Sequence, residues 1–181
     1  QQETELFLQQ QIDEFHKGSV PVAADADSFI TLWQWNRKKN TSVPVRYRTD
    51  VATMVLAAQA ARDLYSLDQQ NRQYQLWYLA NILAASKRLG GIDTPLAHPE
   101  GGAAQIASQA GPEVIHDVFQ QSLENNRIAA AIASAEVLGT IGTPALVEAD
   151  AGKRSPLVQA LLHSNRRLRF TALDTILRLD P

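Results

Sequence analysis

Basic and aromatic side chains alternate between Trp33 and Arg48, a segment without a single acidic residue. Basic residues among aromatic ones can hold a phosphate backbone while the rings stack on bases. The candidate interaction residues of this segment are Trp35, Arg37, Lys38, Lys39, Arg46 and Arg48. A competing structural interpretation, which we favour from the sequence, packs Trp33 in the core and sets the lysines at a helix C-terminus. It also pairs Arg46 and Arg48 with the acidic first helix (Glu3, Glu5, Asp13 and Glu14).

A second basic cluster lies near the C-terminus and consists of Lys153, Arg154, Arg166, Arg167 and Arg169. Arg166 and Arg167 are its candidate interaction residues. In the structural alternative, which we again favour from the sequence, an arginine of this cluster contacts other residues of the fold, and Asp174 is a plausible partner. If both clusters lay on one surface, an anionic partner would be favoured, because aligned charge steers polyanions.

Catalytic signatures are missing from the sequence. His16, His98, His116 and His163 are scattered, with no second histidine at the spacing of a metal-binding helix face. There is no cysteine, which excludes zinc-thiolate sites and thiol catalysis. Nucleophile-elbow, Walker A and dinucleotide-binding motifs are also missing. We therefore expect a protein that is not an enzyme and that holds no cofactor or metal.

Composition constrains the partner only weakly. The formal net charge of −2 over 181 residues argues against a general polyanion binder. No apolar run reaches the roughly 18 to 20 residues of a membrane span, so we expect a soluble chain without one. Cytoplasm and periplasm, or secretion after removal of a signal, remain equally open. The sequence begins at Gln1 without an initiator methionine.

Helical periodicity runs through most of the chain. The predicted helices cover residues 3–17, about 28–39, 49–65, 72–89, 103–110, 112–123 and 156–162, with a further helix in the repeat segment 123–139, a short helix near Leu146, and a last helix opened by Asn165. Residues 19–28 are expected to form a loop. NTSVPVRYR should be extended because Pro44 disfavours helix at Val43. Of this segment only VPVRYR could be a strand, and we expect it to lack a pairing partner.

An internal repeat indicates the architecture. Residues 123–139 align without a gap on residues 162–178, about 40 residues later, which is the period of helical solenoids. The alignment superposes Leu123 on Leu162, Asn126 on Asn165, Arg127 on Arg166, Ala133 on Ala172 and Val137-Leu138 on Ile176-Leu177.

Residues 112–181 resemble HEAT-repeat proteins. The second helix of such repeats often carries a small or polar residue, an apolar residue, Arg and Ala, and Asn165, Leu168, Arg169 and Ala172 fit this pattern. The upstream copy departs from it, since Ala130 stands where Arg169 does. The segment of residues 61–86 is also reminiscent of tetratricopeptide repeats, but Asp68 replaces their usual proline. The HEAT resemblance implies a curved α-solenoid that binds other molecules, most often proteins, without family-wide catalytic residues.

We therefore expect an all-α, HEAT-like superhelix, a right-handed solenoid of antiparallel helix pairs with about seven to nine helices. One domain, residues 1–181, would comprise a sub-bundle (1–89), a glycine- and proline-rich loop (90–102) and HEAT-like pairs (103–181). The last helix stays apolar to its end, where a solenoid normally has a polar cap. We expect a segment of a longer, multi-domain bacterial protein that continues past Pro181.

The function expected from these features is a non-catalytic scaffold for protein–protein interaction. Its partner would be another protein or another domain of the same chain. A nucleic-acid-binding HEAT-like domain is the first alternative, disfavoured by the net charge. A solenoid that binds a small molecule is the second, and it would have a deep apolar pocket beside Trp77 and Tyr78.

Overall fold

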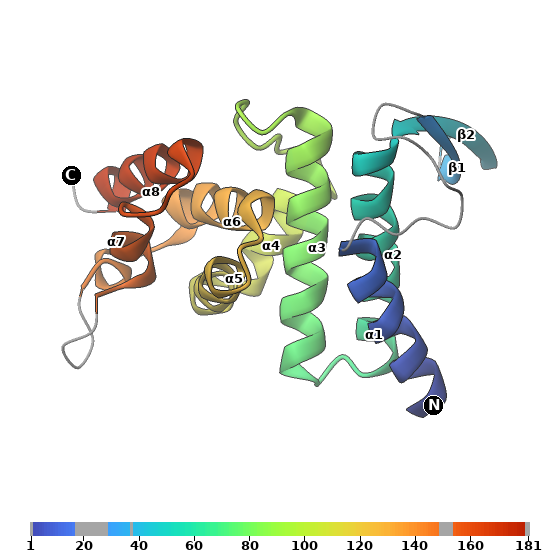
Figure 1. Cartoon of the computed structure of the whole chain (residues 1–181), viewed down its shortest axis with the longest axis horizontal. Coiled ribbons are helices and arrows are strands. Elements are labelled where there is room, and N and C mark those ends of the chain that lie inside the picture. The colour runs from blue at the N-terminus through green and yellow to red at the C-terminus, as the bar shows by residue number, and fades with distance from the viewer. Residues whose placement is uncertain (1, 17–28, 37, 149–153, 180–181) are drawn as a thin grey trace. The chain divides into compact units, whose positions relative to one another are not determined.

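The computed structural model describes residues 2–16, 29–36, 38–148 and 154–179. Within these ranges the chain forms eight α-helices, one short 3-10 helix and a two-stranded sheet (Figure 1). The expectation of a mainly helical fold is confirmed, but the sheet makes the description all-α incomplete. The chain divides into two compact units, Gln1–Leu67 and Asp68–Pro181. The glycine- and proline-rich loop of residues 90–102 lies inside the second unit.

The N-terminal unit contains α1 (Gln2–His16), β1 (Phe29–Asn36), β2 (Thr41–Arg48) and α2 (Thr49–Leu67). Helix α1 and both strands contact α2. The strands pair antiparallel from Phe29 opposite Arg48 to Asn36 opposite Thr41. At the turn, Asn40 adopts a positive φ of 49°, which asparagine tolerates better than most residues. The predicted loop of residues 19–28 lies outside the described residues.

The helix expected over residues 28–39 is therefore wrong, as is the expectation that VPVRYR has nothing to pair with. Residues 29–36 read FITLWQWN and are rich in β-branched and aromatic residues, which favour a pleated strand. Their burial alternates between exposed and half-buried, the period of a strand with one covered face. Because only four residues separate the end of β1 from the start of β2, the two strands form a hairpin.

The C-terminal unit begins with α3 (Arg72–Gly90), α4 (Ala103–Ala110) and α5 (Pro112–Glu124). It continues with α6 (Ile128–Ile141), the 3-10 helix η1 (Pro144–Leu146), α7 (Pro156–Ala160) and α8 (Arg166–Leu179). Predicted caps are confirmed: Ser155 Oγ accepts from Val158 N at 3.3 Å, and Asn165 Oδ1 accepts from Leu168 N at 3.0 Å. Pro112 stands at the first position of α5.

Helix α6 is the packing centre of this unit, because it contacts α3, α4, α5 and α8. Its run from Ala129 to Ala135 is buried on every side, and the small alanine side chains let neighbouring helices approach closely. The pair α5–α6 packs on the pair α7–α8, with α5 against α7 and α6 against α8. The two repeat copies thus lie in successive helix pairs. A superhelical solenoid remains a prediction.

Candidate interaction surfaces

One face of the β1–β2 hairpin carries a cluster of exposed aromatic and basic side chains, which we call the hairpin face. Strand alternation brings Phe29, Thr31, Trp33 and Trp35 of β1 to the same side as Ser42, Pro44, Arg46 and Arg48 of β2. Trp33 is 68% exposed and Trp35 is 61% exposed. The expectation that Trp33 packs in the core is therefore wrong. The half-buried positions on the other face are Ile30, Leu32, Gln34, Asn36, Val43, Val45 and Tyr47.

Both arginines of the hairpin face have defined contacts. The guanidinium of Arg46 lies 5.1 Å from the ring centroid of Phe29, a cation–π arrangement between neighbouring strands. Arg48 Nε lies 3.2 Å from Asp50 Oδ1 at the start of α2. Lys38 and Lys39 are exposed in the turn rather than at the end of a helix, and the backbone N–H of Lys39 donates to Asn36 Oδ1 at 3.0 Å. Arg37 lies outside the described residues.

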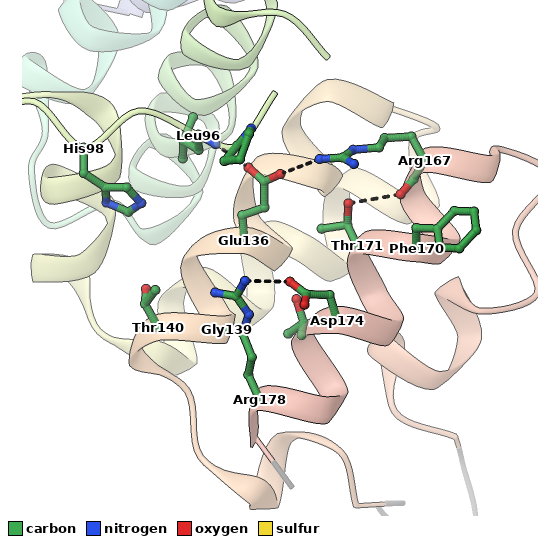
Figure 2. A pocket seen from close by; sticks show the side chains of 12 residues that line it. Leu96, His98, Glu136, Gly139, Thr140, Arg167, Phe170, Thr171, Asp174 and Arg178 are labelled. Atoms are coloured by element: carbon green, nitrogen blue, oxygen red, sulfur yellow. Dashed lines mark hydrogen bonds and ion pairs between the residues drawn. The ribbon is translucent and has the colours of Figure 1, made fainter. Parts of the chain in front are cut away.

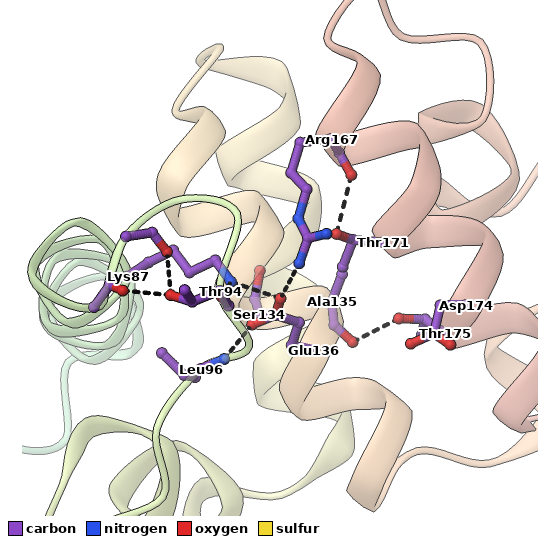
Figure 3. Close-up of polar contacts among 12 residues, drawn as sticks. Lys87, Thr94, Leu96, Ser134, Ala135, Glu136, Arg167, Thr171, Asp174 and Thr175 are labelled. Carbon is purple, nitrogen blue, oxygen red and sulfur yellow. Dashed lines mark hydrogen bonds and ion pairs between the residues drawn. The ribbon is translucent and has the colours of Figure 1, made fainter.

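A buried polar network in the C-terminal unit centres on Glu136 of α6 (Figure 3). Lys87 near the end of α3 is 1% exposed, and its Nζ lies 2.6 Å from Glu136 Oε1 while also donating to the carbonyl of Thr94. The backbone N–H of Leu96 donates to Glu136 Oε2 at 2.9 Å. Arg167 of α8 approaches Oε1 to 3.4 Å. One carboxylate thus joins α3, the loop that follows it, α6 and α8.

Sequence reasoning missed Lys87 and Glu136, although a signal existed. Lys87 continues the helical spacing of Leu76, Leu79 and Leu83, so it falls on the buried stripe of α3. Glu136 is the only charged residue in the mainly apolar α6. A buried charge needs a partner of opposite charge. A lysine on the buried stripe of one helix and a glutamate in a mainly apolar helix are therefore expected to pair with each other.

A cavity of about 340 Å³ lies between α6, α8 and the loop after α3 (Figure 2). Its charged and polar lining includes Glu136, Arg167, Asp174, Arg178 and His98. Asp174 pairs with Arg178 at 2.9 Å, and Glu136 is engaged as described above. The lining charges are therefore largely neutralised within the protein.

The outer side of α8 carries a stripe of exposed apolar residues, which we call the α8 stripe: Phe170, Leu173 and Leu177, spaced at i, i+3 and i+7. They are between 44% and 58% exposed. At 100° per residue these positions share one helix face, opposite to four of the five buried positions of α8, namely Leu168, Ala172, Thr175 and Leu179. Buried Thr175 donates its hydroxyl to the Ala135 carbonyl of α6 at 2.8 Å. Leu173 and Leu177 therefore lie on the side of α8 away from α6, whereas Phe170 also borders the cavity between the two helices.

The C-terminal basic cluster is not a single surface. Arg166 lies beside the α8 stripe, its guanidinium 5.3 Å from the Phe170 ring centroid, whereas Arg167 belongs to the buried network. Arg169 donates to the carbonyls of His163 and Ser164 at 2.8 and 2.9 Å, so it makes structural contacts as expected, but Asp174 pairs with Arg178 instead. Arg154 lines a different cavity of about 550 Å³ between α5 and α7. Lys153 lies outside the described residues.

Neither of these two cavities is lined by Trp77 or Tyr78, the residues beside which a small-molecule-binding solenoid would have its apolar pocket. Trp77 packs instead on Tyr74, with ring centroids 6.1 Å apart. Among the described residues, no three histidine, aspartate or glutamate side chains gather as a metal site. No helix in the described ranges has the length and hydrophobicity needed to cross a membrane.

Comparison of the chain with protein-family models, with curated proteins and with solved structures finds no match. The resemblance to HEAT repeats therefore rests on the residues of this chain alone.

Proposed function

We propose that the protein is a non-catalytic, HEAT-like helical scaffold that binds another polypeptide through the α8 stripe. The observation that carries the proposal is the exposed row of Phe170, Leu173 and Leu177 along α8, of which Phe170 also borders the cavity beside α6. The partner is a helical segment, either of another protein or of another domain of the same chain.

The internal repeat supports a helical partner. Helix α8 covers α6, and α7 covers α5, so each helix pair serves as the platform for the next. In repeat proteins every unit contacts only its neighbours, and an uncovered terminal unit leaves apolar side chains exposed. A helix laid along the α8 stripe would cover it much as α8 covers α6.

The chemistry of the α8 stripe supports a protein interface. Hot spots of such interfaces are enriched in aromatic and arginine side chains and are surrounded by a polar rim. Phe170 supplies the aromatic anchor and Arg166 stacks beside it. Asp174 and Arg178, themselves ion-paired, lie along the edge toward the cavity. Scattered surface leucines need no explanation, but a continuous row on one helix face does.

A site-specific cross-linking scan tests the proposal. A photoreactive amino acid is placed in turn at positions 166, 170, 173 and 177, and at the exposed control position Gln109 of α4, in cells that make this protein. We expect one shared polypeptide adduct at the four α8 positions and none at 109. The cross-linked segment of the partner, mapped by mass spectrometry, should be an amphipathic helix. Equal adduct yields at 109 and at 170 would contradict the proposal.

A further inference from the structure

The hairpin face gathers a patch of large aromatic side chains that the helical scaffold does not use. Trp33 and Trp35 follow each other at i, i+2 on β1, which places them about 7 Å apart on the same side of the strand. Pro44 lies opposite Trp33 and Ser42 lies opposite Trp35, and more than half of each tryptophan is exposed. A contiguous exposed aromatic patch of this kind marks a binding surface.

Positive charge is concentrated in the same hairpin. Residues 29–48 contain five of the 17 basic residues of the chain and none of its 19 acidic residues. Arg46 and Arg48 lie at the open end of the hairpin and Lys38 and Lys39 at its turn, so cations stand at both ends of the tryptophan pair. Within the described part of the chain, Arg46 and both lysines form no ion pair. The hairpin is therefore strongly basic although the net charge of the chain is −2.

We propose that the hairpin face binds single-stranded nucleic acid. Trp33 and Trp35 stack on successive bases, while Arg46, Lys38 and Lys39 contact the phosphates. Base–aromatic stacking needs an exposed base face, which a duplex covers with neighbouring base pairs, so single strands are preferred. Stacking is tolerant of sequence, and the face offers no set of polar groups to read base edges, so the preference for sequence is weak.

A membrane surface is the competing partner and fits less well. Interfacial segments separate a continuous apolar side from a basic side. On the hairpin face, Thr31 and Arg46 lie opposite each other between Phe29 and Trp33, so a hydroxyl and a cation interrupt the aromatic row. This mixture of rings and cations suits a ligand that itself alternates flat bases with phosphates.

The binding test uses the whole chain and a fluorescently labelled 12-nucleotide deoxythymidine strand, followed by anisotropy over a series of salt concentrations. Trp33→Ala and Trp35→Ala should each raise Kd about tenfold, the loss expected for one stacked base. Trp35→Phe, which keeps a ring, should recover most of the affinity. Arg46→Gln should reduce the slope of log K against log salt by about 0.7, the value for one phosphate contact on a single strand.

Matched controls separate stacking from bulk charge. Arg62→Gln removes an exposed arginine of α2 in the same unit and should leave both Kd and the salt slope unchanged. In a Trp77→Phe variant, Trp33 and Trp35 are the only remaining tryptophans. Their fluorescence should be quenched when the strand binds. Far-ultraviolet circular dichroism and an unchanged unfolding midpoint show that each variant folds.

Three results would overturn the inference. The first is no binding of the strand at low salt, and the second is binding that Trp33→Ala and Trp35→Ala leave unchanged. The third is tryptophan-dependent binding to anionic phosphatidylserine vesicles without binding of the strand, which would assign the face to membranes. Leu173→Asp on α8 should leave strand binding unchanged, so failure of this inference and failure of the proposed scaffold function are distinguishable.

Discussion

Lys87 and Glu136 illustrate how one buried ion pair can join four segments of a helical unit. The ammonium group of Lys87 is enclosed, and its charge is balanced by Glu136, which in turn holds the Leu96 N–H and Arg167. Burying a charge is costly unless it is paired and hydrogen-bonded, so the network stabilises the fold only while it is complete.

Removing the charge of Lys87 should destabilise the protein strongly. Lys87→Met keeps the length of the side chain but leaves Glu136 with an incomplete set of partners. We expect a loss of about 3 kcal/mol in the free energy of unfolding, measured by urea denaturation, which is the low end for breaking a buried pair. Arg178→Met breaks the exposed pair with Asp174 and should cost less than about 1 kcal/mol. Equal losses for the two variants would contradict this account.

The sequence could predict the caps at Ser155 and Asn165, because their chemistry is local. It could not predict the roles of the repeated asparagines. Asn165 caps α8 with its side chain, whereas the aligned Asn126 adopts a left-handed conformation with φ of 53° in the turn before α6. Both roles suit asparagine, and only the backbone decides between them.

At the level of elements, the close contact of α6 with α8 and η1 depends on Gly142. A Cβ atom at this position would lie 2.6 Å from the Leu138 carbonyl oxygen and 3.0 Å from side-chain carbons of Leu146 and Leu179. Because the nearest atom belongs to the backbone, it cannot turn aside as a side chain would.

Gly142→Ala should therefore destabilise the protein by about 1 to 3 kcal/mol, the usual cost of overpacking, measured by thermal or urea unfolding. Gly90→Ala is the matched control. A Cβ there meets nothing closer than 3.8 Å, and the position ends helix α3, where alanine is favoured over glycine. This control should be neutral or slightly stabilising. A Gly142→Ala protein as stable as the parent would disprove the proposed close contact.

The elements also show where sequence prediction failed. The helices with long aliphatic stripes, such as α3 and α5, were predicted within a few residues of their ends. The segment FITLWQWN was assigned to a helix because Phe29, Leu32 and Trp33 fit a helical spacing. The same residues fit a strand, and the choice depends on VPVRYR being available as a pairing partner. Pairing between strands is a tertiary property, which a short sequence window does not contain.

At the scale of the whole molecule, the chain divides into two compact units, Gln1–Leu67 and Asp68–Pro181. The sequence placed its composition break at residues 90–102, where glycine and proline gather. The loop there is anchored instead: Leu96 is buried and its N–H is held by Glu136. The glycine and proline content of a segment reflects the local stiffness of the chain. The boundary between compact units depends instead on contacts between segments that are distant in sequence.

The C-terminal unit should fold without residues 1–67. Its ion pairs Lys87–Glu136, Arg167–Glu136 and Arg72–Asp117 all join residues of this unit, as do the contacts of α6 with α3, α4, α5 and α8. We expect a chain of residues 68–181 to show helical circular dichroism and a cooperative thermal transition. A non-cooperative transition with strong binding of a hydrophobic dye, the signature of a molten globule, would contradict this prediction.

The most direct test of the scaffold proposal is the affinity of the purified chain for the polypeptide that cross-links to position 170. Titration calorimetry should give a Kd at least about 30-fold weaker for Phe170→Asp and for Leu173→Asp, equivalent to about 2 kcal/mol for each hot-spot residue. Gln109→Asp introduces the same negative charge at an exposed position of α4 and should leave Kd unchanged. An affinity that is the same for all three variants and the parent would contradict the claim that the α8 stripe binds the partner.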